Sequence, residues 1–402
     1  MSVSAQSNGS APLKRRSALG PGLVAVAFSI LVAALGVVLD ALNVNAFDTV
    51  DKFVGDHRIA WLSPRAAAQR TDVAVVLITE ETLLDYESRS PINRGLLAEL
   101  IRTIDGAGPK AIGLDLIFDR KSSQDAALVA AIRTAKAPVV LGAIDERIPN
   151  LPPQSLAIQD ELLKSMGRPV GHLLLERKEG LLARSDSTVR LIGAPYGSPP
   201  RDSFAAMLAR AAGATHEPEN RIISWQRSPA ANTPLFTTIA VPQHAPRSNS
   251  PGAKNLFPDS WLELIKNRIV LVGATMVDRD QHTTPLSVID GSLIPGVLIH
   301  AQALAQRLDA NRDIQVPPWW MTFPVVALVA FLCFQALRRL RLNPRSFGYE
   351  VVGLLLIGAL SFAAFGVFRI QLPSVALATA WAGGAFGGRH SDWLYRKLGT
   401  ES

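Results

Sequence analysis

Four long apolar segments, one near the N-terminus and three near the C-terminus, constrain this 402-residue chain more than any other feature of its sequence. The first, at residues 19–39, carries no charged residue and has the length needed to cross a hydrocarbon layer of ~30 Å. A cleaved signal peptide would have a shorter apolar core of roughly 7–15 residues, followed by a small-residue cleavage site. No clear site of that kind follows the segment. It is therefore predicted to be an uncleaved membrane anchor.

The three C-terminal apolar segments are predicted to be further membrane helices, at residues 319–337, 349–368 and 372–388. Trp319 and Trp320 open the first of them, at a position typical of the aromatic belt at a membrane surface. With the N-terminal anchor, these segments predict four transmembrane α-helices, one N-terminal and three C-terminal.

Basic residues lie beside the apolar segments and indicate how they are oriented. Runs of Lys and Arg precede the first segment and follow the second and the fourth, whereas only Arg369 lies in the short loop between the third and the fourth. Loops of membrane proteins that face the cytoplasm are enriched in Lys and Arg. The expected soluble segments are a cytoplasmic tail at 1–18, an extracytoplasmic domain at 40–318, a basic cytoplasmic loop at 338–348 and a short cytoplasmic tail at 389–402.

The same distribution of charge bears on location and partners. The net charge of +7 would suit a nucleic-acid-binding protein, but the basic residues gather at the ends of apolar segments and not on one basic patch. We therefore expect the chain to associate with a membrane and not with nucleic acid. The expected location is the bacterial inner membrane, with both termini in the cytoplasm.

Glycines in the last apolar segment favour close helix packing. Gly383, Gly384, Gly387 and Gly388 repeat at the small-xxx-small spacing that lets two helices approach closely. This face is expected either to form a homodimer through the transmembrane helices or to pack within the hairpin of the third and fourth segments.

The part of the chain between the first two apolar segments has the composition of a soluble protein and predicts an α/β fold. Continuous apolar runs at 73–79, 111–118 and 138–144 are typical of strands buried on both faces. Helical periodicity at 94–104 and 125–135 separates them. Because strands and helices alternate, we expect a three-layer domain with a mostly parallel sheet and right-handed crossovers.

The rest of this domain has weaker patterns. Residues 268–273 are predicted to be another buried strand, and residues 295–308 a helix that begins near a proline. The stretch 228–257 is rich in Pro, Ser, Asn and Thr and is predicted to be a long loop. Shorter candidates are strands at 173–176, 189–193 and 222–226 and a helix at 204–212.

Five sequence blocks follow one another in a characteristic order: Val73–Thr79, Ala111–Asp119, Ile269–Thr275, Thr284–Ser287 and Pro295–Leu308. Together with the flanking apolar segments, they resemble the second CHASE family (CHASE domain, type two). Members of that family are extracytoplasmic sensor domains associated with bacterial adenylate cyclases, kinases and phosphatases. The resemblance covers residues 40–320 and implies a membrane-anchored module that perceives a signal outside the cytoplasm.

Family members usually continue into a cytoplasmic catalytic or regulatory domain, and residues 389–402 are too few to form one. We therefore expect the signal to pass through the helices to a separate cytoplasmic or membrane effector protein. An alternative function is that of a structural or assembly subunit of an envelope complex, whose outer domain docks a periplasmic partner.

Acidic residues that follow two predicted strands form the candidate ligand site. In open α/β sheets, ligands bind at the carboxyl ends of the strands, so these residues converge if the two strands are neighbours. Carboxylates with a histidine are suited to a divalent cation or a cationic ligand, whereas the alternative is that the first two aspartates cap turns. No spacing motif identifies a metal or another cofactor. The candidate residues are Asp115 and Asp119 after one strand and Asp278, Asp280 and His282 after the other.

No motif for catalysis is recognisable in the sequence. The G-x-S-x-G and P-loop patterns do not occur, and the single cysteine, Cys333, lies in an apolar segment. His300 lies in the apolar helix at 295–308 and is expected to be a buried, structural histidine. The chain is therefore not expected to be an enzyme, and catalysis by Asp115, Asp119 and His282 is the weaker alternative.

Overall fold

The computed structural model describes residues 21–41, 45–86, 90–149, 151–176, 188–243, 257–276, 280–310, 312–340 and 348–397. The chain divides into two compact units. The sheet unit consists of residues 52–316 and 362–371, and the helical unit consists of the remaining residues.

The described strands all lie in the sheet unit. They are β1 (Arg70–Thr79), β2 (Ala111–Asp115), β3 (Val139–Ala143), β4 (Val170–His172), β5 (Leu175–Glu176), β6 (Leu191–Ile192), β7 (Phe236–Ala240), β8 (Ile269–Thr275), β9 (Gln281–His282) and β10 (Ile294–Pro295).

Helices precede, separate and follow these strands. Those before residue 317 are α1 (Pro21–Ala41), α2 (Asn45–Leu62), the 3-10 helix η1 (Glu81–Leu83), α3 (Arg94–Gly106), α4 (Asp125–Thr134), α5 (Pro153–Met166), α6 (Phe204–Ala211), α7 (Asp259–Glu263), α8 (Ser287–Asp290) and α9 (Gly296–Leu308). Those after it are α10 (Trp319–Leu340), α11 (Gly348–Phe368), α12 (Ser374–Arg389) and α13 (Ser391–Lys397).

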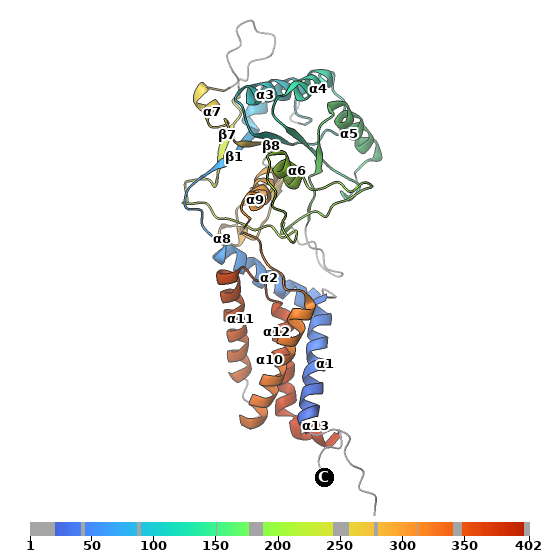
Figure 1. Ribbon diagram of the computed structural model, residues 1–402, viewed down its shortest axis with the longest axis vertical. Coiled ribbons are helices and arrows are strands. Elements are labelled where there is room, and N and C mark those ends of the chain that lie inside the picture. Colours follow the sequence, from blue (N-terminus) through green and yellow to red (C-terminus); the bar gives the residue numbers. More distant parts are fainter. Residues whose placement is uncertain are drawn as a thin grey trace, which may run out of the picture. The chain divides into compact units, whose positions relative to one another are not determined.

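Six strands form one sheet in the order β4-β3-β2-β8-β1-β7 (Figure 1). All five pairings between them are parallel, which confirms the prediction of an α/β fold with a mostly parallel sheet. Although β8 comes last of these six strands in the chain, it lies between β1 and β2. Leu271 is in register with Val75 on one side and with Gly113 on the other.

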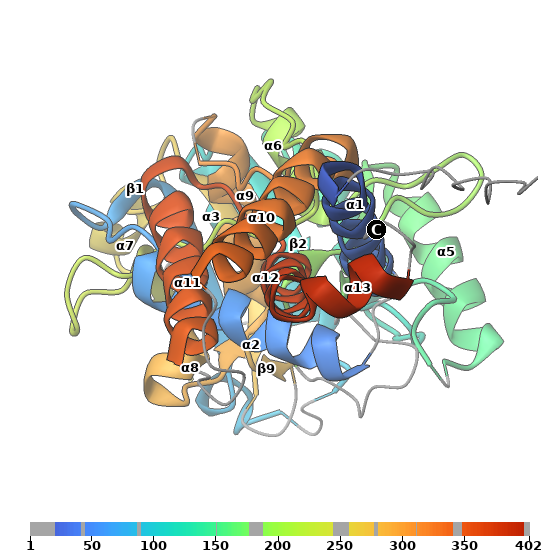
Figure 2. The same ribbon diagram turned by 90° about the horizontal axis from the view of Figure 1, so that it is seen from below.

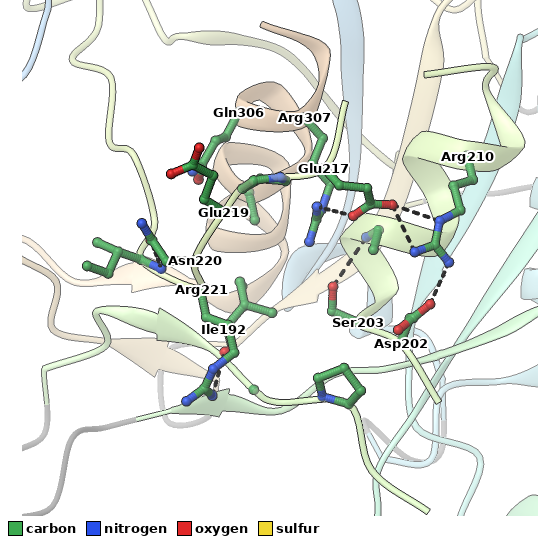
Figure 3. Close-up of a pocket in the computed structure, with 16 residues that line it drawn as sticks. Ile192, Asp202, Ser203, Arg210, Glu217, Glu219, Asn220, Arg221, Gln306 and Arg307 are labelled. Atoms are coloured by element: carbon green, nitrogen blue, oxygen red, sulfur yellow. Dashed lines mark hydrogen bonds and ion pairs between the residues drawn. The ribbon is translucent and has the colours of Figure 1, made fainter. Parts of the chain in front are cut away.

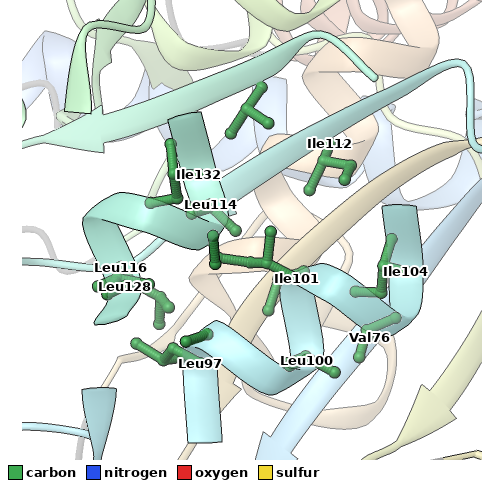
Figure 4. Close-up of a cluster of buried hydrophobic side chains, with 14 of the residues drawn as sticks. Val76, Leu97, Leu100, Ile101, Ile104, Ile112, Leu114, Leu116, Leu128 and Ile132 are labelled. Carbon is green, nitrogen blue, oxygen red and sulfur yellow. The ribbon is translucent and has the colours of Figure 1, made fainter. Parts of the chain in front are cut away.

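Side chains that alternate along the strands build a hydrophobic core on each face of the sheet. On one face, Val76 and Ile112 pack against α3 and α4, as Figure 4 shows for Leu97 and Ile101 of α3. On the other face, residues such as Val75 pack against α6 and α9. The apolar runs of the strands are continuous because both faces are covered.

Local sequence signals explain where several of these helices begin and end. The side chain of Asn93 caps α3 by accepting a hydrogen bond from Leu96 N, and Ser203 caps α6 in the same way through Ala206 N. Gly167 ends α5 with φ of +64°, in the left-handed region that glycine enters without strain. Each large aliphatic side chain that α3 buries contributes roughly 1.5–3 kcal/mol to folding.

The structure corrects the sequence-based elements in four places. The stretch 228–257, predicted as loop, contains the edge strand β7, whose alternating burial and single neighbour give it a weak pattern. The predicted strand 111–118 leaves the sheet after Asp115, where its pairing with β8 ends. Residues 222–226 form an isolated bridge at Ile222 and no strand, and α5 was not predicted.

In the helical unit, α12 packs against α1 and α10 (Figure 2). A Cβ on Gly383 would lie 2.5 Å from Val32 in α1, and one on Gly384 would overlap the Ala330 carbonyl in α10. The glycine face is thus used within the chain, against α1 and α10 and not mainly against α11. Homodimerisation through the membrane helices stays a prediction.

Among the described residues, three helices have the length and apolarity to cross a membrane: Pro21–Leu39, Trp319–Leu340 and Gly348–Phe368. They correspond to the first three predicted membrane segments. The fourth, α12, has 16 residues and is therefore about 24 Å long at 1.5 Å per residue. This is shorter than the ~30 Å hydrocarbon layer, and the fourth crossing stays a prediction.

Candidate functional site

Asp115 ends β2 at the carboxyl edge of the sheet. Its neighbour in β8 is Gly273, with which it is in register. The two strands that precede the predicted acidic groups are therefore adjacent, as convergence requires. Since Ile112 and Leu114 enter the core beneath α3 and α4, the alternation of side chains directs Asp115 to the opposite face, where α6 and α9 pack.

Glycines on this face let the two helices approach the sheet closely. A Cβ on Gly273 would lie 2.6 Å from Val297 Cβ in α9, and one on Gly113 would lie 2.6 Å from Leu208 Cδ2 in α6. Both distances are far inside van der Waals contact, so the close packing requires glycine. Asp115 is in register with Gly273, so it lies beside the position where the first turn of α9 packs against the sheet.

Asp280 and His282 reach the same region from the segment that follows β8. Asp280 Oδ1 lies 3.0 Å from His282 Nε2, and the Asp280 carbonyl accepts a hydrogen bond from Gly296 N across 3.1 Å. A Cβ on Gly296 would lie 2.6 Å from Asp280 Oδ1. The absence of a side chain at Gly296 thus lets the Asp280 carboxylate rest against the first turn of α9.

The carboxyl group of Asp115 has little compensation for its burial. Its Oδ2 atom is buried and has no hydrogen-bond partner within the described residues. Burial raises the pKa of Asp115 well above its ordinary value, and the negative charge of Asp280 raises it further. Asp115 therefore holds a proton over a wider pH range than an exposed aspartate, and its protonated form can donate a hydrogen bond.

Two buried histidines belong to the same region. His300 in α9 is 2% exposed and packs edge-on against Phe204, with 5.5 Å between the ring centroids. His172 ends β4 and is fully buried. The pKa of each is lowered to about 4, mainly by burial and, for His172, also by the positive charge of Arg147. The buried position of His300 agrees with its predicted structural role, whereas no sequence motif singled out His172.

Asp119, another predicted site residue, lies apart from this cluster. Asp119 acts electrostatically on Arg94, a buried arginine that pairs with Asp125 at 3.4 Å and stacks over the Phe118 ring. Asp278 lies outside the described residues. Within the residues that the structure describes, no group of three or more His, Cys, Asp or Glu side chains is arranged to hold a metal ion.

A second candidate site is a cleft of about 200 Å³ between α6, α9, β6 and the segment 217–222 (Figure 3). This volume is below the ~300–1,000 Å³ of sites for drug-sized ligands, and it suits a small metabolite. Sequence reasoning did not find the cleft, because its charged residues are scattered along the chain. Its charged lining residues are Asp202, Arg210, Glu217, Glu219, Arg221 and Arg307.

Ion pairs connect most of these charges. Arg210 contacts Glu217 at 2.8 Å and also pairs with Asp202. Arg307 Nη1 contacts the other oxygen of Glu217 at 2.9 Å, so the two guanidinium groups flank a single carboxylate (Figure 3). Burial lowers the pKa of Arg307. Arg221 pairs with Glu176, which lies outside the cleft.

The loop after α11 is packed into the sheet unit. Gln315 donates a backbone hydrogen bond to Arg369 O and accepts one from Gln371 N, both at 2.9 Å. The Arg369 side chain lies over the Phe365 ring and donates from Nη2 to Ser224 Oγ at 2.6 Å. Residues 362–371 are therefore an integral part of this unit, although the rest of α11 belongs to the helical unit.

Comparison with known proteins gives one family. The family described as the CHASE2 domain matches residues 24–336. No curated protein and no solved structure matches the chain.

Proposed function

The chain belongs to the CHASE2 family of extracytoplasmic sensor domains, and from this premise we propose that it is a membrane-anchored sensor. In this proposal the sheet unit binds a signal on the outer side of the bacterial inner membrane. The helices then pass the signal to an effector. The three long apolar helices support the membrane location.

The proposed topology has four crossings, with both termini and the basic segment 338–348 in the cytoplasm and a three-layer domain outside. The positive charges beside the apolar segments support this orientation. Because α12 is short for a full crossing, its closely packed glycine face against α1 and α10 supports placing it inside the bundle and away from lipid.

The observation that carries the proposed signalling role is the docked loop at residues 369–371. The chain passes from the helical unit into the sheet unit within α2 and returns between α9 and α10, and the docked loop adds a third connection between α11 and α12. A conformational change in the sheet unit would therefore act on several helices together. A signal can cause such a change only if it binds two conformations with different affinity.

The effector in this proposal is a separate cytoplasmic or membrane protein that contacts the helices. The chain itself is proposed to bind its signal and not to transform it, which agrees with the non-catalytic character of the family. A structural subunit of an envelope complex would use the same outer domain as a fixed docking surface. That alternative predicts that the function of the protein does not depend on the contacts that hold the hairpin loop at residues 369–371.

The proposed orientation is tested by cysteine labelling in intact cells. Cys333 is the only native cysteine and is buried, so Cys333→Ala supplies a background without thiols. We expect Ser123→Cys, at an exposed position of the sheet unit, to react with a membrane-impermeant maleimide once the outer envelope is opened. Ser402→Cys should react only after the inner membrane is permeabilised. The reverse pattern would refute the proposed sidedness.

The proposed signalling role is tested with Arg369 variants of the full chain in its own cell. Arg369 has φ of +58°, so Arg369→Gly removes the side chain without straining the backbone, and Arg369→Lys keeps the charge. A sensor predicts that Arg369→Gly changes the transcript profile at unchanged protein level, with a smaller change for Arg369→Lys. An unchanged profile in Arg369→Gly, with the envelope complex still present on native gels, would favour the structural alternative.

A further inference from the structure

The cleft between α6 and α9 is electrically balanced. Three arginines and three carboxylates line it, and its uncharged polar side chains are already engaged. Gln306 accepts a hydrogen bond from Ser224 N and donates one to Asp313, both near 3 Å. Asn220 donates to the Ile314 carbonyl. A ligand must therefore be recognised by the charged groups.

Two of those charged groups have unused capacity that faces the cleft. Arg307 makes one hydrogen bond within the described residues, from Nη1 to Glu217, although a guanidinium carries five N–H donors. Its side chain is 15% exposed, so the remaining donors are held in a partly dehydrated place. Glu219 makes no ion pair with any described residue and is exposed at the cleft.

We propose that this cleft binds a small zwitterion of the α-amino-acid class, with the ligand carboxylate on Arg307 and its ammonium group on Glu217. Glu219, at the exposed edge of the cleft, adds a further negative charge to the lining. The proposal rests on the proposed sensor function and names the chemical class of its signal. Alanine and proline side chains supply the apolar lining that would contact the ligand side chain, at Pro195, Ala206, Pro218 and Ala303.

Partner exchange explains why a zwitterion fits better than a simple anion. Glu217 now bridges Arg210 and Arg307. When Arg307 turns to the ligand carboxylate, Glu217 keeps Arg210 and its second oxygen becomes free for the ligand ammonium group. Arg210, Arg307 and Glu217 each keep a partner of opposite charge throughout this exchange. A simple carboxylate would bring a second anion beside that oxygen of Glu217 and offer it no cation. Because the Glu217 side chain is 49% exposed, water weakens this repulsion, but the repulsion still disfavours a simple anion relative to a zwitterion.

The cleft is also connected to the hairpin loop by consecutive hydrogen bonds. Gln306 lines the cleft and accepts from the backbone N of Ser224 at 2.9 Å. The Ser224 hydroxyl then accepts from Arg369 at 2.6 Å. A ligand that moves Arg307 acts on the neighbouring residue of α9, so the cleft is placed where occupancy can alter how the loop is held.

The test uses the full chain in detergent with each of the common L-amino acids. The heat of binding is measured by titration calorimetry, and the melting temperature is measured at increasing amino-acid concentration. We expect at least one amino acid to raise the melting temperature with rising ligand concentration. The N-acetyl and the carboxamide derivatives of that amino acid, which each lack one charge, should bind at least about tenfold more weakly. Equal binding of either derivative would overturn the zwitterion assignment.

Variants locate the binding in this cleft. Arg307→Gln should weaken binding by at least about tenfold, whereas Lys121→Gln should not change it. Lys121 forms a 3.0 Å ion pair with Glu161 that is largely exposed and serves as the matched control. In Glu217→Gln, the amino acid and its N-acetyl derivative should bind with more similar affinities than in the unmodified chain. Unchanged affinity in Arg307→Gln would place the ligand elsewhere and overturn the proposal.

The outcomes separate this proposal from the sensor function. If no amino acid binds while Arg369→Gly still changes the transcript profile, the ligand class is wrong and the sensor function stands. If amino acids bind at Arg307 while Arg369→Gly has no effect on the profile, the cleft is a binding site and the proposed signalling route is wrong.

Discussion

Arg369 donates a hydrogen bond from Nη2 to the hydroxyl of Ser224, 145 residues earlier in the chain, across 2.6 Å. Arg312 donates to the carbonyl of the same serine, also at 2.6 Å. Ser224 is fully buried. The Ser224 hydroxyl thus accepts a hydrogen bond from the guanidinium of the hairpin loop, and the Ser224 carbonyl accepts one from a guanidinium in the segment before α10.

Ser224→Ala is expected to loosen the hairpin loop. Removal of the hydroxyl leaves Arg369 Nη2 without an acceptor next to Nη1, which already has no partner among the described residues. An unsatisfied buried donor costs about 1–3 kcal/mol, so the melting temperature of the full chain should fall by a few degrees. Hydrogen exchange of the Gln371 amide should become faster. Ser123→Ala, at an exposed position, is the control, and equal exchange in both variants would contradict the role of Ser224.

Asp115→Asn is expected to stabilise the protein at neutral pH. Because the pKa of Asp115 is raised in the folded state, its ionisation opposes folding, and the stability present at low pH is lost as the pH rises through the folded pKa. Asparagine does not ionise and can still donate a hydrogen bond. We expect a gain of about 1–3 kcal/mol at pH 8, seen as a higher melting temperature. A lower melting temperature at pH 8 would indicate that the charged carboxylate has a favourable partner.

The two buried histidines predict that stability falls in acid. The pKa of His172 and that of His300 are each lowered from 6.5 to about 4 by burial. The unfolded chain therefore takes up these protons first as the pH falls. The contribution of the two neutral histidines to stability is fully present above pH 6.5. It is lost between pH 6.5 and 4, by on the order of 2–3 kcal/mol for each histidine.

Variants separate this effect from that of the carboxylates. His172→Asn and His300→Asn should each reduce the change in melting temperature between pH 6.5 and 4. The measurement uses the Asp115→Asn background, which removes the opposite pH dependence caused by Asp115. An unchanged slope in both variants would mean that other groups cause the acid sensitivity.

Gly273→Ala is expected to destabilise the packing of α9 on the sheet. The added Cβ would lie 2.6 Å from Val297 Cβ, so the helix or the strand must move, at a cost of about 1–3 kcal/mol. Gly106→Ala is the matched control, because a Cβ on Gly106 meets nothing within 4 Å and alanine favours a helix. Melting temperatures of the two variants should move in opposite directions, and equal shifts would contradict the steric argument.

Periodicity within the sequence was sufficient for those elements whose pattern is local. The apolar run at β1 predicted a strand buried on both faces, and the helical spacing in α3 predicted an amphipathic helix; both occur. By contrast, β7 was interpreted as loop. An edge strand has one neighbour and alternating exposure, so its few buried residues resemble those of an irregular segment flanked by prolines.

The sequence by itself determined the apolar segments, the alternation of strands and helices, and the family, because each depends on residues close together in the chain. Tertiary structure alone decided that β8 inserts between β1 and β2, which joins Asp115 to the Asp280 region and leaves Asp119 beside Arg94. It also decided that Arg210 and Arg307 share Glu217 and that Arg369 reaches Ser224. Such contacts depend on strand order and on helix packing across the sheet, and these follow from the packing of the whole core and not from any local pattern.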